Sequence, residues 1–277
     1  MGLRASRADI LRRVIAVVAA TFFYAPLTVG AAELRIGGTG NALGTMRLLA
    51  EAYAQSHPES KPLILSSIGT SGAIKSVAKG ALEIGLSSRA LTEEETGSGL
   101  TAIEYARSPT VFAVQEKSKF SSLSLQQITD IYSGKLTQWP DGTVIRLVLR
   151  QPGDDNTRQI MQLSPEMANA VNIASQRPGM IFGFNDQEAA DKMENLSGSL
   201  GVTTIALIRS EKRRLKAVAL EGVEPSLENM RSGRYSLIKH FNFVLPKNPS
   251  PAVQDFIGFV KSPQGRKILE NIGHTVP

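Results

Sequence analysis

The sequence predicts an α/β fold of two lobes, in which strands lead through polar loops into helices. Short apolar runs are followed several times by Gly, Ser, Thr or Asn and then by a helical pattern. Without residues 1–31, which have a signal-peptide pattern, about 246 residues remain, and this length suits two lobes better than one domain. Two strand-type runs, at 109–114 and 235–245, lie where the chain would leave the first lobe and return to it. We therefore expect two lobes joined by two crossing strands.

Residues 1–31 have the pattern of a cleavable signal peptide. Four arginines precede an apolar stretch at 14–25, and Val29-Gly-Ala31 supplies small residues for cleavage. The apolar stretch is shorter than the ~20 residues that a membrane-spanning helix needs, and Pro26 interrupts it. An uncleaved anchor is the alternative. We expect a protein exported to the periplasm.

The charge and the lack of cysteine exclude several classes of function. The chain carries +6, but residues 1–31 hold four arginines and one aspartate, so about +3 remains after cleavage. This balance suits an anionic ligand without requiring one, and it gives little support to nucleic-acid binding. Without cysteine there is no disulfide, thiolate metal site or thiol nucleophile. We expect no metal and no cofactor.

The first strand–loop–helix unit lies at 34–57. A short strand at 34–38 leads to Thr39, Gly40 and Asn41, and a helix with an apolar stripe then runs to His57. Its glycines only superficially imitate a dinucleotide fingerprint, because the spacing departs from G-x-G-x-x-G and the next strand lacks a closing acidic residue.

The second unit begins with an apolar run from Leu63, which predicts a buried strand. The polar loop at 67–72 and a helix closed by Gly80 follow. The first N–H groups of a helix lack intrahelical partners and carry partial positive charge, so such a loop is suited to an anion. Thr70 and Ser71 either cap the helix or turn their hydroxyls to a ligand. An ordinary capped helix start is the alternative for one such loop.

A third unit ends at Ser88 and Arg89, after the strand 82–87. Ligands of open parallel sheets lie at the carboxyl ends of the strands, so three consecutive units direct donors to one edge. Arg89 is either an anion ligand or a surface residue. The pattern Thr92-Glu-Glu-Glu95 then predicts a capping box and a further helix.

The second lobe repeats the arrangement with a guanidinium added. A capping box at 124–127 opens a helix that Gly134 closes, and a strand at 144–149 leads to Arg150 and a polar loop. Planar guanidinium donors bind two oxygens of an oxyanion at once, although a turn with a surface arginine is the alternative. Ser-Pro pairs at 250–251 and 262–263 begin two final helices.

These motifs, in this order, resemble the phosphate-transport substrate-binding proteins, which are the periplasmic receptors of ABC-type phosphate importers. The resemblance covers essentially all of the mature chain and is carried by Thr39-Gly-Asn41, 68–75, 84–89, 128–139, Arg150 with its loop, 199–201, 222–235 and 256–265. It implies a type II periplasmic-binding-protein fold, with two mixed sheets flanked by helices. It also implies a first lobe of 32–110 plus 244–277 and a second lobe of 111–243.

The resemblance further implies a dehydrated oxyanion in the cleft between the lobes. The ligand positions correspond to Thr39, Gly40, Asn41, Thr70, Ser71, Gly72, Ser88, Arg89, Arg150, Asp154, Asp155, Asn156 and Thr157. Two positions depart from the family pattern. The third loop has Ser87-Ser-Arg89 at the corner where better-characterised members have an Asp that accepts the proton of hydrogen phosphate, and a Gly-Asp-Asp-Asn-Thr run replaces their Ser-Gly-Thr. Either Asp154 or Asp155 supplies the missing acceptor, or the pair faces solvent and the site favours another ligand.

We expect a monomer that binds inorganic phosphate or a related oxyanion and delivers it to an ABC permease in the inner membrane. The sequence leaves arsenate, sulfate and larger oxyanions open, and it also allows a sensor or adhesin without a transporter. A secreted hydrolase is the remaining alternative, but His57, His240 and His274 are isolated and no catalytic motif accompanies them. We expect no enzyme activity and no nucleic-acid partner.

Overall fold

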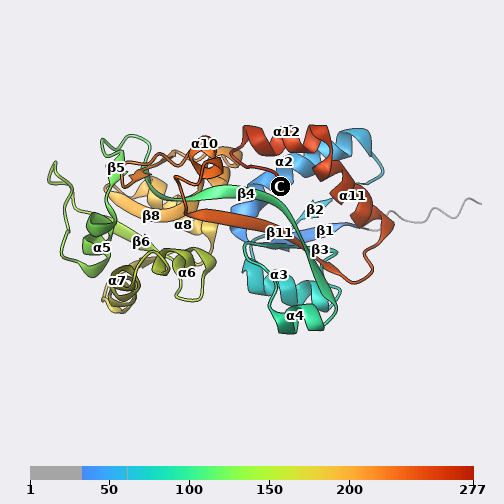
Figure 1. The fold of residues 1–277 in the computed structure, drawn as a ribbon, viewed down its shortest axis with the longest axis horizontal. Coiled ribbons are helices and arrows are strands. Elements are labelled where there is room, and N and C mark those ends of the chain that lie inside the picture. Colours follow the sequence, from blue (N-terminus) through green and yellow to red (C-terminus); the bar gives the residue numbers. More distant parts are fainter. Residues whose placement is uncertain (1–32, 61) are drawn as a thin grey trace, which may run out of the picture. The chain divides into compact units, whose positions relative to one another are not determined.

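A computed structural model describes residues 33–60 and 62–277. The predicted signal peptide at 1–31 lies outside the described residues. Over the described part, the chain forms an α/β fold around a nine-stranded mixed sheet of order β2-β1-β3-β11-β4-β8-β6-β7, with β9 paired to β4 (Figure 1). A small parallel pair, β5 and β10, lies apart from this sheet. Among these residues no helix is both long and apolar enough to cross a membrane.

The first lobe begins with the predicted strand–loop–helix units. Strand β1 lies between β2 and β3, and all three run parallel. Strand β2 is short and partly exposed, so the expected buried strand at this point is wrong. The elements are β1 (Arg35–Gly38), α2 (Gly40–Ser56), β2 (Leu63–Ile64), α3 (Gly69–Ala78), β3 (Ile84–Ser87) and α4 (Glu93–Gly97).

Two long antiparallel strands carry the chain between the lobes, as predicted. Strand β4 (Leu100–Gln115) pairs along the whole of β11 (Ile238–Pro246), with a bulge between Phe241 and Asn242. The far end of β4 continues into the second lobe, where it pairs with β8 and β9. The two expected sheets are therefore joined through β4 into one hydrogen-bonded surface.

The second lobe contains the middle of the chain. Strand β6 runs parallel to both β7 and β8. The elements of the second lobe are β5 (Ser122–Leu123), α5 (Leu125–Ser133), β6 (Arg146–Leu149), α6 (Asp155–Met161), α7 (Pro165–Gln176), β7 (Ile181–Phe182), α8 (Asp186–Asn195), β8 (Ser199–Thr204), α9 (Ile205–Ser210), β9 (Leu215–Ala217), β10 (Ala219–Leu220) and α10 (Leu227–Arg231).

The last two helices return to the first lobe. Helices α11 (Pro251–Lys261) and α12 (Pro263–Asn271) begin at the predicted Ser-Pro pairs, and Ser250 and Ser262 cap them through their side chains. Both contact α2, beside which they lie in Figure 1. The capping boxes at Thr92 and Ser124 are confirmed as well. Hydrogen-bonding side chains at helix starts are local signals, which explains why the sequence predicts them well.

Each lobe has its own apolar core. The first-lobe core packs Tyr53 against Phe256, with buried residues drawn from 34–106 and from 241–269. The main second-lobe core surrounds Phe112, Tyr132 and Trp139. The exact lobe boundaries at 110 and 244 stay a prediction. Two cores joined by a two-stranded connection leave the polar strand ends of the two lobes facing one another, and the candidate site lies there.

Candidate functional site

The start of α2 lies against the start of α8. Gly38 has φ of +153°, and a Cβ atom there would come within 2.1 Å of the Leu86 carbonyl oxygen, so only glycine allows β1 to pass this closely to β3. A Cβ atom on Gly40 would meet Asp186 at 2.7 Å. The N–H of Asn41 donates to Asp186 Oδ2 at 3.1 Å. The Asp186 carboxylate thus already accepts a hydrogen bond from one of the N–H groups that the sequence predicts to bind the ligand.

Helix α3 begins at Gly69, and Ile68 is its N-cap residue without any side-chain bond. Neither Thr70 nor Ser71 therefore caps the helix. The Thr70 hydroxyl instead donates to Asp155 Oδ2 at 2.5 Å, and its oxygen accepts the N–H of Ser88 at 3.1 Å. The hydroxyl of Ser88 also donates to Asp155 Oδ2. Two first-lobe hydroxyls thus converge on one second-lobe carboxylate.

Asp155 is the first residue of α6 and holds its charge with the help of these donors. Burial alone would raise the pKa of Asp155, but the hydroxyls of Ser88 and Thr70 and the cations Lys239 and Arg158 stabilise the ionised form. The pKa therefore lies below its usual value. Asp155 is an ionised acceptor at neutral pH.

Arg150 lies directly after β6, as predicted. Its Nη2 is 2.7 Å from Asp154 Oδ2 and its Nη1 donates to the Gly183 carbonyl oxygen at 2.6 Å. Its Nε is 3.7 Å from Asp186 Oδ1 and is buried without a hydrogen-bond partner among the described residues. Asp154 also caps α6 by accepting the N–H of Asn156 at 2.9 Å. The two aspartates of the predicted pair therefore have different tasks.

Asn156 connects both lobes and the crossing strand. Lys239 Nζ donates to Asn156 Oδ1 at 2.6 Å, and Asn156 Nδ2 donates to Asp186 Oδ1 at 3.1 Å. Asn41 Nδ2 also approaches Asn156 Oδ1, at 3.4 Å. Because the Lys239 ammonium can only donate, its contact with Asn156 fixes the amide oxygen of Asn156 on the side of Lys239. Asn156 is fully buried and bridges the lobes through its own side chain.

A pocket of about 500 Å³ is lined by residues of both lobes. The first lobe contributes the start of α3, and the second lobe contributes the loop after β6 and the residues before α8. Its lining residues are Ser67, Ile68, Gly69, Thr70, Ser71, Arg150, Gln151, Gly153, Asp154, Asp155, Arg158, Phe184 and Asn185. A second hollow of about 470 Å³ lies beyond Asp155 and includes Ser88, Arg89 and Lys239. Asp155 and Arg158 border both.

Several predicted positions lie away from the 500 Å³ pocket. The guanidinium of Arg89 binds Glu95 at 2.7 Å, and the pKa of Glu95 is lowered to about 2 by that hydrogen bond. Apart from Thr157, the other predicted positions that do not line the pocket are Thr39, Gly40, Asn41, Gly72, Ser88 and Asn156. The first three belong to the α2 start, and Ser88 lines the 470 Å³ hollow. Their roles in ligand binding stay predictions.

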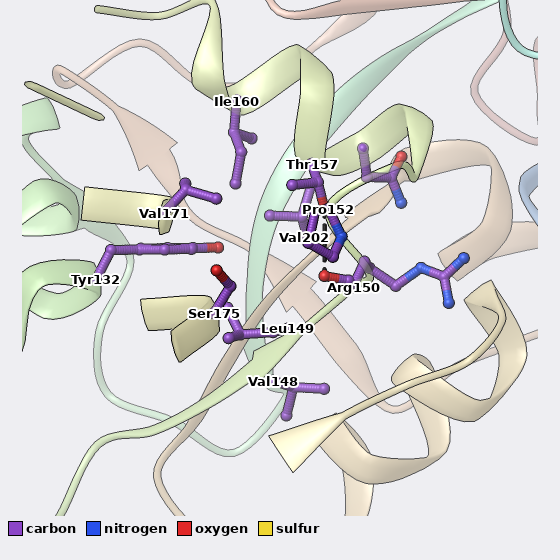
Figure 2. A pocket seen from close by; sticks show the side chains of 11 residues that line it. Tyr132, Val148, Leu149, Arg150, Pro152, Thr157, Ile160, Val171, Ser175 and Val202 are labelled. Carbon is purple, nitrogen blue, oxygen red and sulfur yellow. Dashed lines mark hydrogen bonds between the residues drawn. The ribbon is translucent and has the colours of Figure 1, made fainter. Parts of the chain in front are cut away.

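Thr157 lines a different, mostly apolar cavity. Figure 2 shows the side chains around this cavity: the guanidinium of Arg150 extends away from it, while the hydroxyls of Tyr132 and Ser175 point into it. The Thr157 hydroxyl donates to the Arg150 carbonyl oxygen at 3.4 Å. The cavity offers about 10 Å³, which is room for about one water molecule. It is too small for an oxyanion.

Sequence reasoning missed Asp186 and Lys239. Lys239 lies on β11 and is 2% exposed, and Asp186 is buried at the start of α8. Burial raises the pKa of Asp186 to about 6; Arg150 and Lys239 oppose this shift and Asp154 adds to it. The available signals were a lysine within an apolar strand run and an aspartate directly after the helix cap Asn185. Neither signal indicates that the two lie near Arg150.

The three histidines lie in three separate surroundings. His57 stacks on Tyr53, His240 bonds Glu104 through Nδ1 at 2.8 Å, and His274 is buried beside Thr45. Within residues 33–60 and 62–277, no cluster of three or more acidic or histidine side chains is suited to a metal ion.

The comparisons with known proteins agree with the fold. A family model of the PBP superfamily domain matches residues 25–264. The phosphate-binding protein PstS 2 of Streptococcus pneumoniae is 36% identical over 107 residues, which are 39% of this chain and 36% of that protein. The chain thus spans about a third of the length of this curated relative.

Solved structures share the fold across most of the chain. A Clostridium perfringens protein with bound phosphate, assigned as a phosphate ABC transporter substrate-binding protein, has a TM-score of 0.74 at 23% identity and covers 88% of this chain and 99% of its own. An ABC-type phosphate transport receptor from Vibrio cholerae has a TM-score of 0.63 at 22% identity, over 88% and 100%. The relatives are named as binding proteins and transport receptors, in agreement with the expectation of a binding protein rather than an enzyme.

Proposed function

Because the chain belongs to the PBP superfamily, we propose that it is a periplasmic substrate-binding protein that captures phosphate between its lobes for an ABC-type importer. One observation carries the proposal. Thr70 at the α3 start and Ser88 direct their hydroxyls to Asp155 at the α6 start, and the α3 start, Asp155 and Arg150 together line the 500 Å³ pocket. Donors at helix starts together with a guanidinium are the chemistry that binds oxyanions.

The carboxylates already in the site support an oxyanion ligand. A carboxylate oxygen accepts the same hydrogen bonds as a phosphate oxygen, so Asp155 on Thr70 and Ser88 demonstrates that these donors converge on a single anionic atom. Asp186 on the Asn41 N–H supports the same role for the α2 start. The entering anion replaces or shares these contacts.

Asp155 gives a reason to favour a protonated oxyanion. A carboxylate repels a bound anion unless the anion carries a proton that the two can share. Because Asp155 is ionised and faces both hollows, it is suited to accept the P–OH proton of hydrogen phosphate. Sulfate has no proton to give at neutral pH and would be repelled. The acceptor missing from the first lobe is then supplied across the cleft, from the second.

Isothermal titration calorimetry with phosphate tests the site. Arg150→Ala should lower phosphate affinity about 100-fold or more, because each charge-assisted hydrogen bond contributes roughly 1.5–3 kcal/mol. Arg146→Ala is the matched control, since Arg146 lies on the same β6 and its Nη1 binds the Ser197 carbonyl oxygen at an exposed position. Equal affinity of the Arg150 variant and the wild type would show that the site is elsewhere.

Delivery to a permease and the monomeric state are parts of the same proposal. Light scattering coupled to gel filtration tests the monomer directly. Phosphate uptake in cells that carry or lack this chain tests the transport role. Binding without any effect on uptake would favour a sensor or adhesin.

A further inference from the structure

We propose that Asp186 takes up a proton when the oxyanion binds, so that anion capture by this chain is coupled to proton uptake. The inference rests on the proposed function, since it concerns the same site. It assigns a role to Asp186, a buried carboxylate that accepts a hydrogen bond from a predicted anion donor and, when ionised, is negatively charged like the proposed ligand.

Asp186 competes with the ligand for its donors. Its Oδ2 accepts the Asn41 N–H at 3.1 Å, and its Oδ1 accepts from Asn156 Nδ2 at the same distance. Arg150 Nε lies 3.7 Å from Oδ1 and has no other partner among the described residues. An anion in the 500 Å³ pocket that binds the Arg150 guanidinium therefore comes to lie next to this carboxylate.

The charges of the site leave no excess positive charge for a ligand. The buried cations are Arg150 and Lys239, and the carboxylates around them belong to Asp154, Asp155 and Asp186. Arg158 also pairs with Asp155, but its side chain is 46% exposed. With Arg158 the ligand-free cluster is neutral, and without it the cluster is negative. Adding an anion to such a buried cluster requires compensation, and protonation of one carboxylate supplies it.

Asp186 is the carboxylate best placed to accept that proton. Asp155 has two hydroxyl donors and Arg158, and Asp154 has the short contact to Arg150. Asp186 has only amide donors and the longer contact to Arg150. Its low exposure agrees with a pKa already raised to about 6, which a neighbouring anion raises further.

The groups that face Asp186 come from four elements. Arg150 follows β6, Asp154 precedes α6, and Lys239 belongs to β11; Arg150 and Lys239 favour the charged form and Asp154 opposes it. From α2 only the Asn41 N–H reaches it. On its own helix, Glu188 is paired with Lys192 at 2.6 Å. An added anion therefore raises the pKa of a carboxyl group whose pKa is already raised to about 6 in this surrounding.

Protonation helps the anion in two ways. A neutral Asp186 no longer attracts Arg150, so Nε is available to the ligand. Its new O–H also becomes a donor next to the anion. The proton comes from solvent, and no covalent bond of the ligand changes.

Calorimetry in buffers of different ionisation enthalpy counts the protons. Wild type, Asp186→Asn and Asp191→Asn are titrated with inorganic phosphate at pH 7.5 in Pipes, Hepes and Tris. Asp191 is the control because it lies on the same helix with an exposed side chain. We expect wild type and the Asp191 variant to take up about half to one proton more per phosphate than the Asp186 variant. Phosphate's own titration cancels, since all three proteins see the same ligand at the same pH.

Equal proton uptake by wild type and Asp186→Asn would overturn the inference while leaving the proposed function intact. Failure of wild type to bind phosphate would overturn both. If the Asp186 variant does not fold, wild type alone decides. Its proton uptake must exceed that expected from phosphate speciation, and the absence of any excess would refute the role.

The pH dependence of phosphate affinity separates this role from a merely structural one. If Asp186 is merely structural, its replacement weakens binding by the same factor at every pH. In the proposed role, the affinity of the variant relative to wild type rises by up to tenfold per pH unit between pH 6 and 8.

Discussion

Asp155 and Asp186 hold the same position in two different helices, and their environments push their pKa values in opposite directions. Each is the first residue of a second-lobe helix, and each accepts hydrogen bonds from a helix start or strand end of the first lobe. The pKa of Asp155 is lowered, whereas that of Asp186 is raised to about 6. Burial acts on both, but only Asp155 has two hydroxyl donors on one oxygen and an arginine on the other.

The difference indicates how one site can hold both an acceptor and a donor. Two carboxylates with separated pKa values divide the roles of base and acid between them. Asp155 remains ionised and suits the proton of the ligand. Asp186, whose pKa burial raises to about 6, suits the fully ionised side of the proposed ligand. The hydrogen-bond donors around each carboxylate, rather than its burial alone, decide whether its pKa is lowered or raised.

The cation that both carboxylates share should have the largest effect. Lys239→Met removes the buried ammonium that bonds Asn156 and whose charge acts on Asp155 and Asp186, and leaving buried charges uncompensated costs about 3–5 kcal/mol. We expect the free energy of unfolding in urea to fall by that amount. Lys247→Met, at an exposed position just after β11, should change it by less than about 0.5 kcal/mol. A Lys239 variant as stable as its control would mean that the carboxylates are not ionised together.

Removing the charge of Asp155 should abolish the preference for a protonated ligand. In Asp155→Asn we expect phosphate affinity to fall about 10- to 100-fold, the value of one charge-assisted hydrogen bond, while sulfate binds no worse than to wild type. Competitive titration of the two anions measures both. The double variant Asp154→Asn/Asp155→Asn provides the stricter test, since phosphate affinity that survives in it would refute the acceptor role.

Asp186→Asn should stabilise the ligand-free protein at neutral pH. The folded pKa of about 6 lies above the ordinary 3.8, so the ionised form is disfavoured in the folded state. The resulting penalty is absent below about pH 4, grows as the pH rises and is complete above about pH 6. We expect a gain of about 1–3 kcal/mol at pH 7.5 that disappears toward pH 4. Urea unfolding at both pH values measures it, and a gain independent of pH would contradict the shift.

Arg89 should have the smallest effect. Its guanidinium is engaged by Glu95 in a partly exposed ion pair, so Arg89→Gln should lower phosphate affinity less than about threefold and stability by about 0–1 kcal/mol. Glu95→Gln frees the guanidinium and provides the counterpart measurement. A tenfold loss in the Arg89 variant would establish Arg89 as a ligand.

The sequence predicted what depends on neighbours along the chain. The capping boxes at Thr92 and Ser124, the two Ser-Pro helix starts and the position of Arg150 after its strand are local patterns. The separate tasks of Asp154 and Asp155 were not predictable, because adjacent residues at a helix start point in different directions and only the opposite lobe decides which meets a donor. Lys239 and Asp186 were missed because 53 positions separate them and only the crossing strand brings them together.

Strand β11 lies between β3 and β4, and this position governs the order in which the chain can fold. The first strand of the first lobe, β1, begins at Arg35, yet the sheet of this lobe lacks an inner strand until residues 238–246 have been made. Its core also needs Phe256 and Leu269. The second lobe draws its strands β5 to β10 from the middle of the chain. During synthesis the first lobe is therefore the first to be started and the last to be finished, with the edges of β3 and β4 unpaired until the end.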